Sequence, residues 1–500
     1  MTVDKAPLPG GEAEPSGPPL DSAPSAAAGA RRARPYRRGA LIAVFAAIVL
    51  IVASTGTLVA ARYAESFRQS SATVAEPPPL VEVQPAILPL PDAAPMPTQD
   101  EVAAALDPWL SDPALGSLAG RVTDASTGTV LWAQDHTERR IPASAAKVLT
   151  GAAALLVLPL DGRVETRVVA GSEPGEVVLV GAGDVTLSAQ PEGAPTYYEG
   201  APRIDDLAAQ VRDSGTEVRR VVVDTTAFTG ARLAPGWSPE SVGEGYVAPM
   251  EPVMLDGGRI DPLEPESPRW DEPALAAGRT LAERLGADPD SVTAGVASTG
   301  AQVLAQVSSA PLRVRLDQFM QQSDNVLAEA IGREIAVAVG EPASFRGAVR
   351  AIPAVLAEHG LPADDIVLAD ASGLSRENVL SVSALDTLLA RAAAESAAPE
   401  ELAADDTAAA LRPLLDLLPV AAGTGTLEAR FTEAAASGTG WVRAKTGTLD
   451  GVNALAGYAV TRTGRVLTFA FISTDSSAFE ARPALDALAA QLRTVPRAGE

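Results

Sequence analysis

Residues 142–158 read PASAAKVLTGAAALLVL and place a serine and a lysine three positions apart at the start of a run of alanine and leucine. Proline suits a first helical turn and the run is a strong helix former, so this stretch predicts a helix. Ser144 and Lys147 would share one helix face, with Ser144 near its positive end. A serine, a base one turn further on and a positive helix end are the parts that acyl transfer needs. Taken alone, Ser144 could also be an ordinary N-cap residue.

The composition excludes several other chemistries. The chain has 500 residues, 47% of them hydrophobic, which is enough for a large core and up to three domains. It has no cysteine, so disulfides, a thiolate nucleophile and a cysteine metal site are excluded. Only His136 and His359 are present, far apart in the sequence, so we expect no metal and no cofactor. The net charge of −24 argues against nucleic acid as a partner and fits a solvated acidic surface.

Lysine is rare in this chain. There are 36 arginines but only three lysines, which are Lys5, Lys147 and Lys445. Arginine cannot lose its proton in a protein, and its planar fork is the wrong shape for some sites. A lysine kept in an arginine-rich chain is therefore a candidate for chemistry, although chance survival is the alternative.

The second lysine of the folded part opens the motif Lys445-Thr446-Gly447-Thr448. The segments 453–461 and 466–474 predict a β-hairpin, which would put the motif on the strand before it. A cation and two hydroxyls on an exposed strand edge suit a carboxylate. Glycine leaves space where a substrate backbone could approach. The alternative is a plain turn between strands.

A third polar motif, Ser323-Asp324-Asn325, lies between two helical stripes of apolar residues at 312–320 and 327–335. In isolation Ser323 would be an N-cap residue. Together with the other two motifs it completes the order S-x-x-K, S-D-N, K-T-G. That ordered set is the signature of penicillin-binding proteins and serine β-lactamases.

Other segments extend this likeness to one family. The chain resembles the D-alanyl-D-alanine carboxypeptidase/endopeptidase family of penicillin-binding proteins, peptidase family S13. The resemblance covers most of residues 101–475, and all three asparagines of the chain fall in it. Ala182 and Val185 depart from the family pattern G-G-G-D-P-T-L. The matching segments are 122–131, Gly181–Leu187, Asp370–Asn378, Gly425–Leu427 with Arg430, and Lys445–Asn453.

The resemblance implies a fold of the mixed α/β (α+β) class. We expect an antiparallel sheet flanked by helices, in a catalytic domain built from residues 101–162 and 306–495. The 179 positions between Ser144 and Ser323 imply a domain inserted after the S-x-x-K helix, at residues 163–305. Short alternating runs rich in valine and glycine predict that this domain is mostly β.

The resemblance also implies roles for the motif residues. Ser144 would attack the D-Ala-D-Ala bond of a peptidoglycan stem peptide, and Lys147 would take its proton. Ser323 would relay a proton to the leaving amine, and Asn325 would hold Lys147 and the substrate amide. The backbone N–H groups of Ser144 and Thr448 would form the oxyanion hole. β-Lactams would be trapped on the same serine. The implied substrate-binding residues are Lys445, Thr446, Gly447 and Thr448.

Two other functions use the same fold. A class A β-lactamase has a Glu-x-x-x-Asn loop between the last two motifs, but here Glu377 and Asn378 are adjacent. The large insertion is also unlike a β-lactamase. A catalytically silent wall-binding protein is the second alternative, and the intact Ser144, Lys147, Ser323 and Lys445 argue against it.

The N-terminal hundred residues predict a membrane tether. Residues 1–38 predict a disordered tail that ends in five arginines, and residues 39–61 carry no charge. As a helix, 23 residues span about 34 Å, enough to cross a bilayer. The positive-inside rule puts the tail in the cytoplasm and the catalytic part outside the cell membrane. Residues 62–100 are rich in proline and predict an extended stalk. A cleaved signal peptide ending at Ala61 is the alternative.

Overall fold

The structure, a computed structural model, describes residues 94–394 and 406–495. No helix within these ranges combines the length and the apolar character that crossing a membrane requires. The predicted tail, the predicted span at 39–61 and most of the predicted stalk lie outside the described residues.

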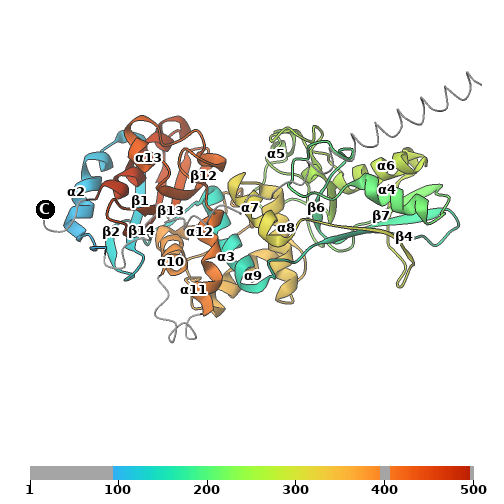
Figure 1. Cartoon of the computed structure of the whole chain (residues 1–500), viewed down its shortest axis with the longest axis horizontal. Helices are drawn as coiled ribbons and strands as arrows, with labels where there is room; N and C mark the ends of the chain where they lie inside the picture. The colour runs from blue at the N-terminus through green and yellow to red at the C-terminus, as the bar shows by residue number, and fades with distance from the viewer. Residues whose placement is uncertain (1–93, 395–405, 496–500) are drawn as a thin grey trace, which may run out of the picture. The chain divides into compact units, whose positions relative to one another are not determined.

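A five-stranded antiparallel sheet forms the centre of the catalytic part (Figure 1). Its strand order is β12-β13-β14-β1-β2. The first strand of the described chain pairs with the last, from Ser117 opposite Thr474 to Asp124 opposite Leu467. The predicted hairpin is confirmed as β13 and β14, and the K-T-G motif lies on β12. The strands are β1 (Ser117–Asp124), β2 (Val130–Gln134), β12 (Val442–Leu449), β13 (Val452–Val460) and β14 (Val466–Thr474).

Successive residues of each strand point to opposite faces of this sheet. Both faces are buried, because each packs into a hydrophobic core of its own. Leu455 and Phe471 are paired across β13 and β14 and pack with Leu485 of α13. The neighbouring pair, Ala454 and Ile472, belongs to the other core, which includes the helix that follows Ser144. The expected antiparallel sheet flanked by helices is confirmed. One face is covered by α2 (Gln99–Leu110) and α13 (Ala478–Thr494), and the other by α3 (Lys147–Val157) and α10 (Val382–Ala393).

A group of helices lies between this sheet and the inserted region (Figure 1). Their apolar stripes meet in one core, where Leu149 of α3 packs with Phe319 and Ile331, two of the residues whose spacing predicted helices around the S-D-N motif. These helices are α7 (Leu312–Gln321), α8 (Asn325–Ala338), α9 (Phe345–Glu358), α11 (Asp406–Leu411) and α12 (Pro413–Leu417). Two short strands, β3 (Arg139–Arg140) and β11 (Leu380–Ser381), pair with each other beside them.

The inserted region is a mixed α/β unit, so the expectation that it is mostly β is wrong. Its sheet has the order β10-β4-β5-β7-β9, and β5 pairs in parallel with β7, as β7 does with β9. Parallel neighbours need long crossover connections, and here helices supply them. The helix α4 buries Ile204, Leu207, Ala208 and Val211, spaced as one helical stripe.

The elements of the inserted region are β4 (Glu165–Ala170), β5 (Glu176–Gly181), β6 (Asp184–Leu187), α4 (Ile204–Asp213), β7 (Arg220–Asp224), α5 (Glu240–Gly243), β8 (Val253–Leu255), α6 (Pro273–Leu285), β9 (Thr293–Gly295) and β10 (Val303–Ser308). The helices α4 and α6 pack on the valine-rich face of the sheet. The loops around α5 and β8 are important for the site described next.

Candidate active site

The predicted serine–lysine pair lies at the start of α3. Ser144 is in a 3₁₀ turn, Ala143–Ala146, and the α-helix begins at Lys147. The tight turn packs directly on β12: a Cβ atom at Gly447 would come within 2.6 Å of the Pro142 carbonyl oxygen. Gly447 is therefore needed for contact with the nucleophile turn.

Lys147 is fully buried and donates three hydrogen bonds. Its Nζ lies 3.1 Å from Ser144 Oγ, 2.6 Å from Asn325 Oδ1 and 2.7 Å from the carbonyl oxygen of Ser372. Burial lowers the pKa of Lys147 to about 8, although the carboxylates of Asp370 and Glu329 act in the opposite direction. A lysine whose pKa is near neutral can take a proton from the adjacent serine.

The loop that supplies the Ser372 carbonyl is held by two buried carboxylates. Glu329 Oε1 accepts hydrogen bonds from the backbone N–H groups of Ala371 (2.9 Å) and Ser372 (2.8 Å). Asp370 accepts from the N–H groups of Gly373 (2.7 Å) and Ser375 (2.6 Å). Burial and the charge of Asp370 raise the pKa of Glu329 to about 7, while Arg333 opposes them. The segment 370–378, quoted above for the family resemblance, thus shapes the surroundings of Lys147.

The S-D-N motif connects α7 to α8. Asp324, rather than Ser323, caps α8, because its Oδ1 accepts from the Leu327 N–H at 2.8 Å. Ser323 has a φ of +57°, which turns the chain sharply before the cap. Asn325 opens α8, and while its Oδ1 binds Lys147, its Nδ2 donates to the carbonyl of Tyr246 at 2.9 Å. The amide is therefore held between the base and the inserted region.

A second buried network ties the same loop to the inserted region. Arg259 and Asp324 form an ion pair of 3.1 Å in which both side chains are only 2% exposed. The hydroxyl of Tyr198 donates to the same carboxylate at 3.0 Å, and the Arg259 guanidinium lies 3.5 Å from the centre of the Tyr197 ring. Burial alone would raise the pKa of Asp324, but the charges of Arg259 and Arg269 outweigh burial and hold it below its usual value.

Lys445 lies behind the site on β12 and is fully buried. Its Nζ donates to Ser323 Oγ and to the Thr446 carbonyl, each at 2.9 Å. Burial, with the nearby charge of Lys147, lowers the pKa of Lys445 well below its ordinary value. The side chain of Thr446 bonds Thr426 Oγ1 at 2.9 Å. The three sequence motifs therefore lie together in one site. In it Lys147 is hydrogen-bonded to Ser144, and Lys445 is hydrogen-bonded to Ser323.

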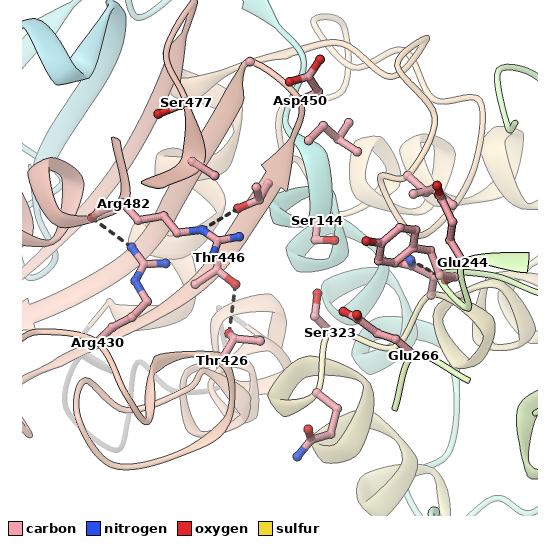
Figure 2. A pocket seen from close by; sticks show the side chains of 18 residues that line it. Ser144, Glu244, Glu266, Ser323, Thr426, Arg430, Thr446, Asp450, Ser477 and Arg482 are labelled. Carbon is pink, nitrogen blue, oxygen red and sulfur yellow. Dashed lines mark hydrogen bonds between the residues drawn. The ribbon is translucent and has the colours of Figure 1, made fainter. Parts of the chain in front are cut away.

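These groups face a cavity of about 820 Å³ (Figure 2). Of the predicted site residues, Ser144, Ser323, Asn325, Thr446 and Thr448 line it, whereas Lys147, Lys445 and Gly447 lie behind its wall. In Figure 2, Arg430 and Arg482 lie on one side of Ser144, and Glu244 and Glu266 on the other.

Several of the lining residues were not assigned from the sequence. Thr426 and Arg430 lie in a segment that carried the family resemblance, but no role was given to them. Arg482 comes from α13, which has no motif, and Glu244, Tyr246 and Glu266 come from loops of the inserted region. Only the fold brings Arg482 and the three residues of the inserted region to the motifs, so the sequence offered no local signal for these four.

Comparisons with known proteins find relatives that match most of the chain. The model of the D-Ala-D-Ala carboxypeptidase 3 (S13) family matches residues 102–267 and 262–495. Carboxypeptidase DacB of Mycolicibacterium smegmatis is 47% identical over 465 residues, covering 92% of this chain and 98% of that protein. A carboxypeptidase of Mycobacterium tuberculosis is 46% identical over 461 residues, covering 91% and 97%.

Among solved structures, penicillin binding protein 4 (dacB) of Haemophilus influenzae matches with a TM-score of 0.62 at 19% identity. The match covers 79% of this chain and 98% of that one. At this identity the likeness concerns the fold, which is shared over nearly the whole of that protein.

Proposed function

The chain belongs to the D-Ala-D-Ala carboxypeptidase 3 (S13) family and is a serine-type carboxypeptidase, and from this premise we propose that it hydrolyses the D-Ala-D-Ala bond of peptidoglycan stem peptides through an acyl-enzyme on Ser144. The observation that carries the proposal is the pair of Ser144, which lines the cavity, and Lys147, a buried base 3.1 Å from its hydroxyl.

The proposed reaction begins when Ser144 Oγ attacks the substrate carbonyl and Lys147 takes its proton. Asn325 holds Lys147 and orients the substrate amide. The N–H groups of Ser144 and Thr448 receive the developing oxyanion, for about 3–4 kcal/mol per donor. The C–N bond then breaks, and the leaving D-Ala takes a proton through Ser323, whose hydroxyl accepts a hydrogen bond from Lys445. Water finally hydrolyses the ester and regenerates Ser144.

Binding of β-lactams is part of the same proposal. The penicillin binding protein 4 of H. influenzae has been solved in complex with a novel β-lactam, and that structure matches this chain with a TM-score of 0.54. A β-lactam presents a strained amide to the serine, so we expect it to acylate Ser144 and to leave slowly. The family match favours the carboxypeptidase over a β-lactamase.

We also propose that the enzyme acts outside the cell membrane, tethered by residues 39–61. Five arginines before an uncharged stretch of 23 residues support this topology. A substrate in the cell wall is consistent with it.

Release of D-Ala from diacetyl-Lys-D-Ala-D-Ala tests the proposed activity. The wild-type protein should release D-Ala, and Ser144→Ala should lose all measurable activity, because among the described residues Ser144 is the only hydroxyl that is hydrogen-bonded to Lys147. The control is Ser437→Ala, since Ser437 only donates a weak hydrogen bond to the Ala490 carbonyl, at 3.3 Å. Activity that survives in Ser144→Ala would contradict the assignment.

A further inference from the structure

One cation of the cavity wall forms no direct ion pair with any residue that the structure describes. Arg482, on α13, lines the cavity beside β12, and its Nε donates to Thr448 Oγ1 at 3.3 Å (Figure 2). Within the described ranges of the chain, no carboxylate forms an ion pair with it. Burial and then the charge of Arg430 lower the pKa of Arg482, while the carboxylate of Asp486, which is paired with Arg430, acts in the opposite direction.

The neighbouring cation is already neutralised. Arg430 forms a bidentate pair with Asp486, with Nε 3.0 Å from Oδ2 and Nη2 2.6 Å from Oδ1. Its Nη2 also donates to the backbone carbonyl of Arg482 at 3.3 Å. Arg430 therefore fixes the backbone beneath Arg482, and the charge left for a ligand belongs to Arg482.

Lys445 is poorly placed to contact a ligand directly. It is fully buried, does not line the cavity, and uses its Nζ on Ser323 and the Thr446 carbonyl. A ligand that enters the cavity beside β12 meets the hydroxyls of Thr446 and Thr448 and the guanidinium of Arg482.

Positively and negatively charged side chains line different parts of the cavity. Arg482 lies on the β12 side of Ser144, whereas Glu244 and Glu266 lie on the opposite side (Figure 2). Asp450, which follows the end of β12, also lines the cavity, so the guanidinium of Arg482 is the group on this side that can attract a carboxylate, while the two glutamates repel one. An arginine fork matches a carboxylate in shape as well as in charge.

We infer that Arg482, aided by the Thr448 hydroxyl, binds the free carboxylate of the substrate's C-terminal residue and makes the enzyme select peptides that end in this group. The inference rests on the proposed function and deepens it. In this assignment Lys445 acts through its hydrogen bond to Ser323 and through its positive charge, and Arg482 contacts the substrate carboxylate directly. Losing the contact should penalise only those substrates that carry the carboxylate.

The test compares two substrates, diacetyl-Lys-D-Ala-D-Ala and the same peptide with a C-terminal amide. For Arg482→Gln we expect kcat/KM on the acid to fall about 10- to 100-fold, as for loss of a hydrogen-bonded charge. On the amide it should stay within about twofold, because the amide offers arginine no charge to bind. Arg482→Lys should be intermediate on the acid and unchanged on the amide.

Arg443→Gln is the matched control. Arg443 is on β12, but it pairs with Asp416 at the surface, 3.6 Å away, and does not line the cavity. The control removes the same charge and should keep the wild-type preference for the acid.

The two substrates separate the possible failures. If the wild-type protein releases neither D-Ala from the acid nor D-alaninamide from the amide, the proposed function itself fails. If it is active but Arg482→Gln loses activity equally on acid and amide, or on neither, the assignment of Arg482 is overturned. Should Arg482→Gln not fold, the same comparison on Arg482→Lys decides, since a loss confined to the acid is expected there too.

Discussion

Lys147 has to be a base in one step and must still be held in place while it is charged. The structure reconciles these needs by burying the ammonium group among three neutral acceptors, with carboxylates only in the next layer. Burial destabilises the charged form, and the carbonyl and amide oxygens orient the nitrogen toward Ser144. The proton can therefore leave for a modest cost in free energy.

The rate of acylation should follow the protonation of Lys147. With a pKa of about 8, only the neutral fraction is a base, so the second-order rate with a fluorescent penicillin should rise as pH increases and level off above about 8. Below pH 7 the rate should fall about tenfold per pH unit. Melting temperatures measured across the same range control for unfolding. A rate that is flat between pH 6 and 9 would show that Lys147 does not titrate in the step.

Arginine at each lysine separates their roles. Lys147→Arg should abolish acylation, because arginine stays charged and cannot accept the serine proton. Lys445→Arg should keep measurable acylation, because Lys445 acts through its charge and its hydrogen bond to Ser323. Both positions are fully buried, so each variant is the size-matched control for the other. Equal acylation rates for the two folded variants would mean that Lys147 is not the base.

For single residues, the sequence predicted a functional role only where few residue types could fill the position. The rarity of lysine singled out Lys147 and Lys445, and the motif order associated them with Ser323. Arg482 is one arginine among 36, and its identity carries no signal. The Ser372 carbonyl is a backbone group and could not be found from residue types at all.

Among the elements, the loop before α8 depends on the inserted region. Asp324 is held by Arg259 and Tyr198, while Asn325 is held by the Tyr246 carbonyl. The positive φ at Ser323 is a backbone conformation that few side chains favour, so these contacts are needed to maintain it. The inserted region is thus a support for the catalytic residues.

Removing this support should affect both stability and rate. Arg259→Met leaves the Asp324 carboxylate buried without its partner, which typically costs about 3–5 kcal/mol in the free energy of unfolding. Movement of Ser323 and Asn325 should slow penicillin acylation about 10- to 100-fold. Denaturant unfolding and acylation of the folded variant measure the two effects.

The control for Arg259→Met is Arg284→Gln. Arg284 pairs with Asp205 at 2.6 Å on the surface of the inserted region, with both side chains about a third exposed. Its loss should cost less than about 1 kcal/mol and leave acylation unchanged. If Arg259→Met is destabilised yet acylates at the wild-type rate, the network supports the fold but does not position the motif.

Local patterns predicted those elements whose periodicity is simple. The hairpin β13–β14 and the helices α7 and α8 follow from alternating and helical stripes. The inserted region was misread because its short valine runs resemble antiparallel strands, while α4 is short and half of its residues are polar. Parallel pairing of β5 with β7 depends on a crossover and leaves no mark in either strand.

For the molecule as a whole, the two ends of the catalytic part meet in one sheet. The pairing of β1 with β14 joins residues about 350 positions apart, and the inserted region leaves and returns between α3 and α7. The order of the three motifs along the chain was therefore more informative than any one of them, because only this fold brings them to one cavity.

The predicted topology can be tested on the native protein. We expect residues 1–38 to be retained, because five arginines and a long tail precede the uncharged stretch. N-terminal sequencing of the membrane fraction should begin at or near Met1. A sequence that begins near Arg62 would instead show a cleaved signal peptide, and extraction by alkaline carbonate would show whether the protein is held by a span.

The central claim is that Ser144 is the nucleophile, and the site of penicillin attachment tests it most directly. Trypsin should release residues 141–147, a peptide in which Ser144 is the only hydroxyl. After treatment with penicillin, mass spectrometry should find one stable adduct per chain, on this peptide, and none in Ser144→Ala. Rapid loss of the adduct would indicate a β-lactamase. An adduct on any other peptide, or no adduct on a folded protein, would contradict the account.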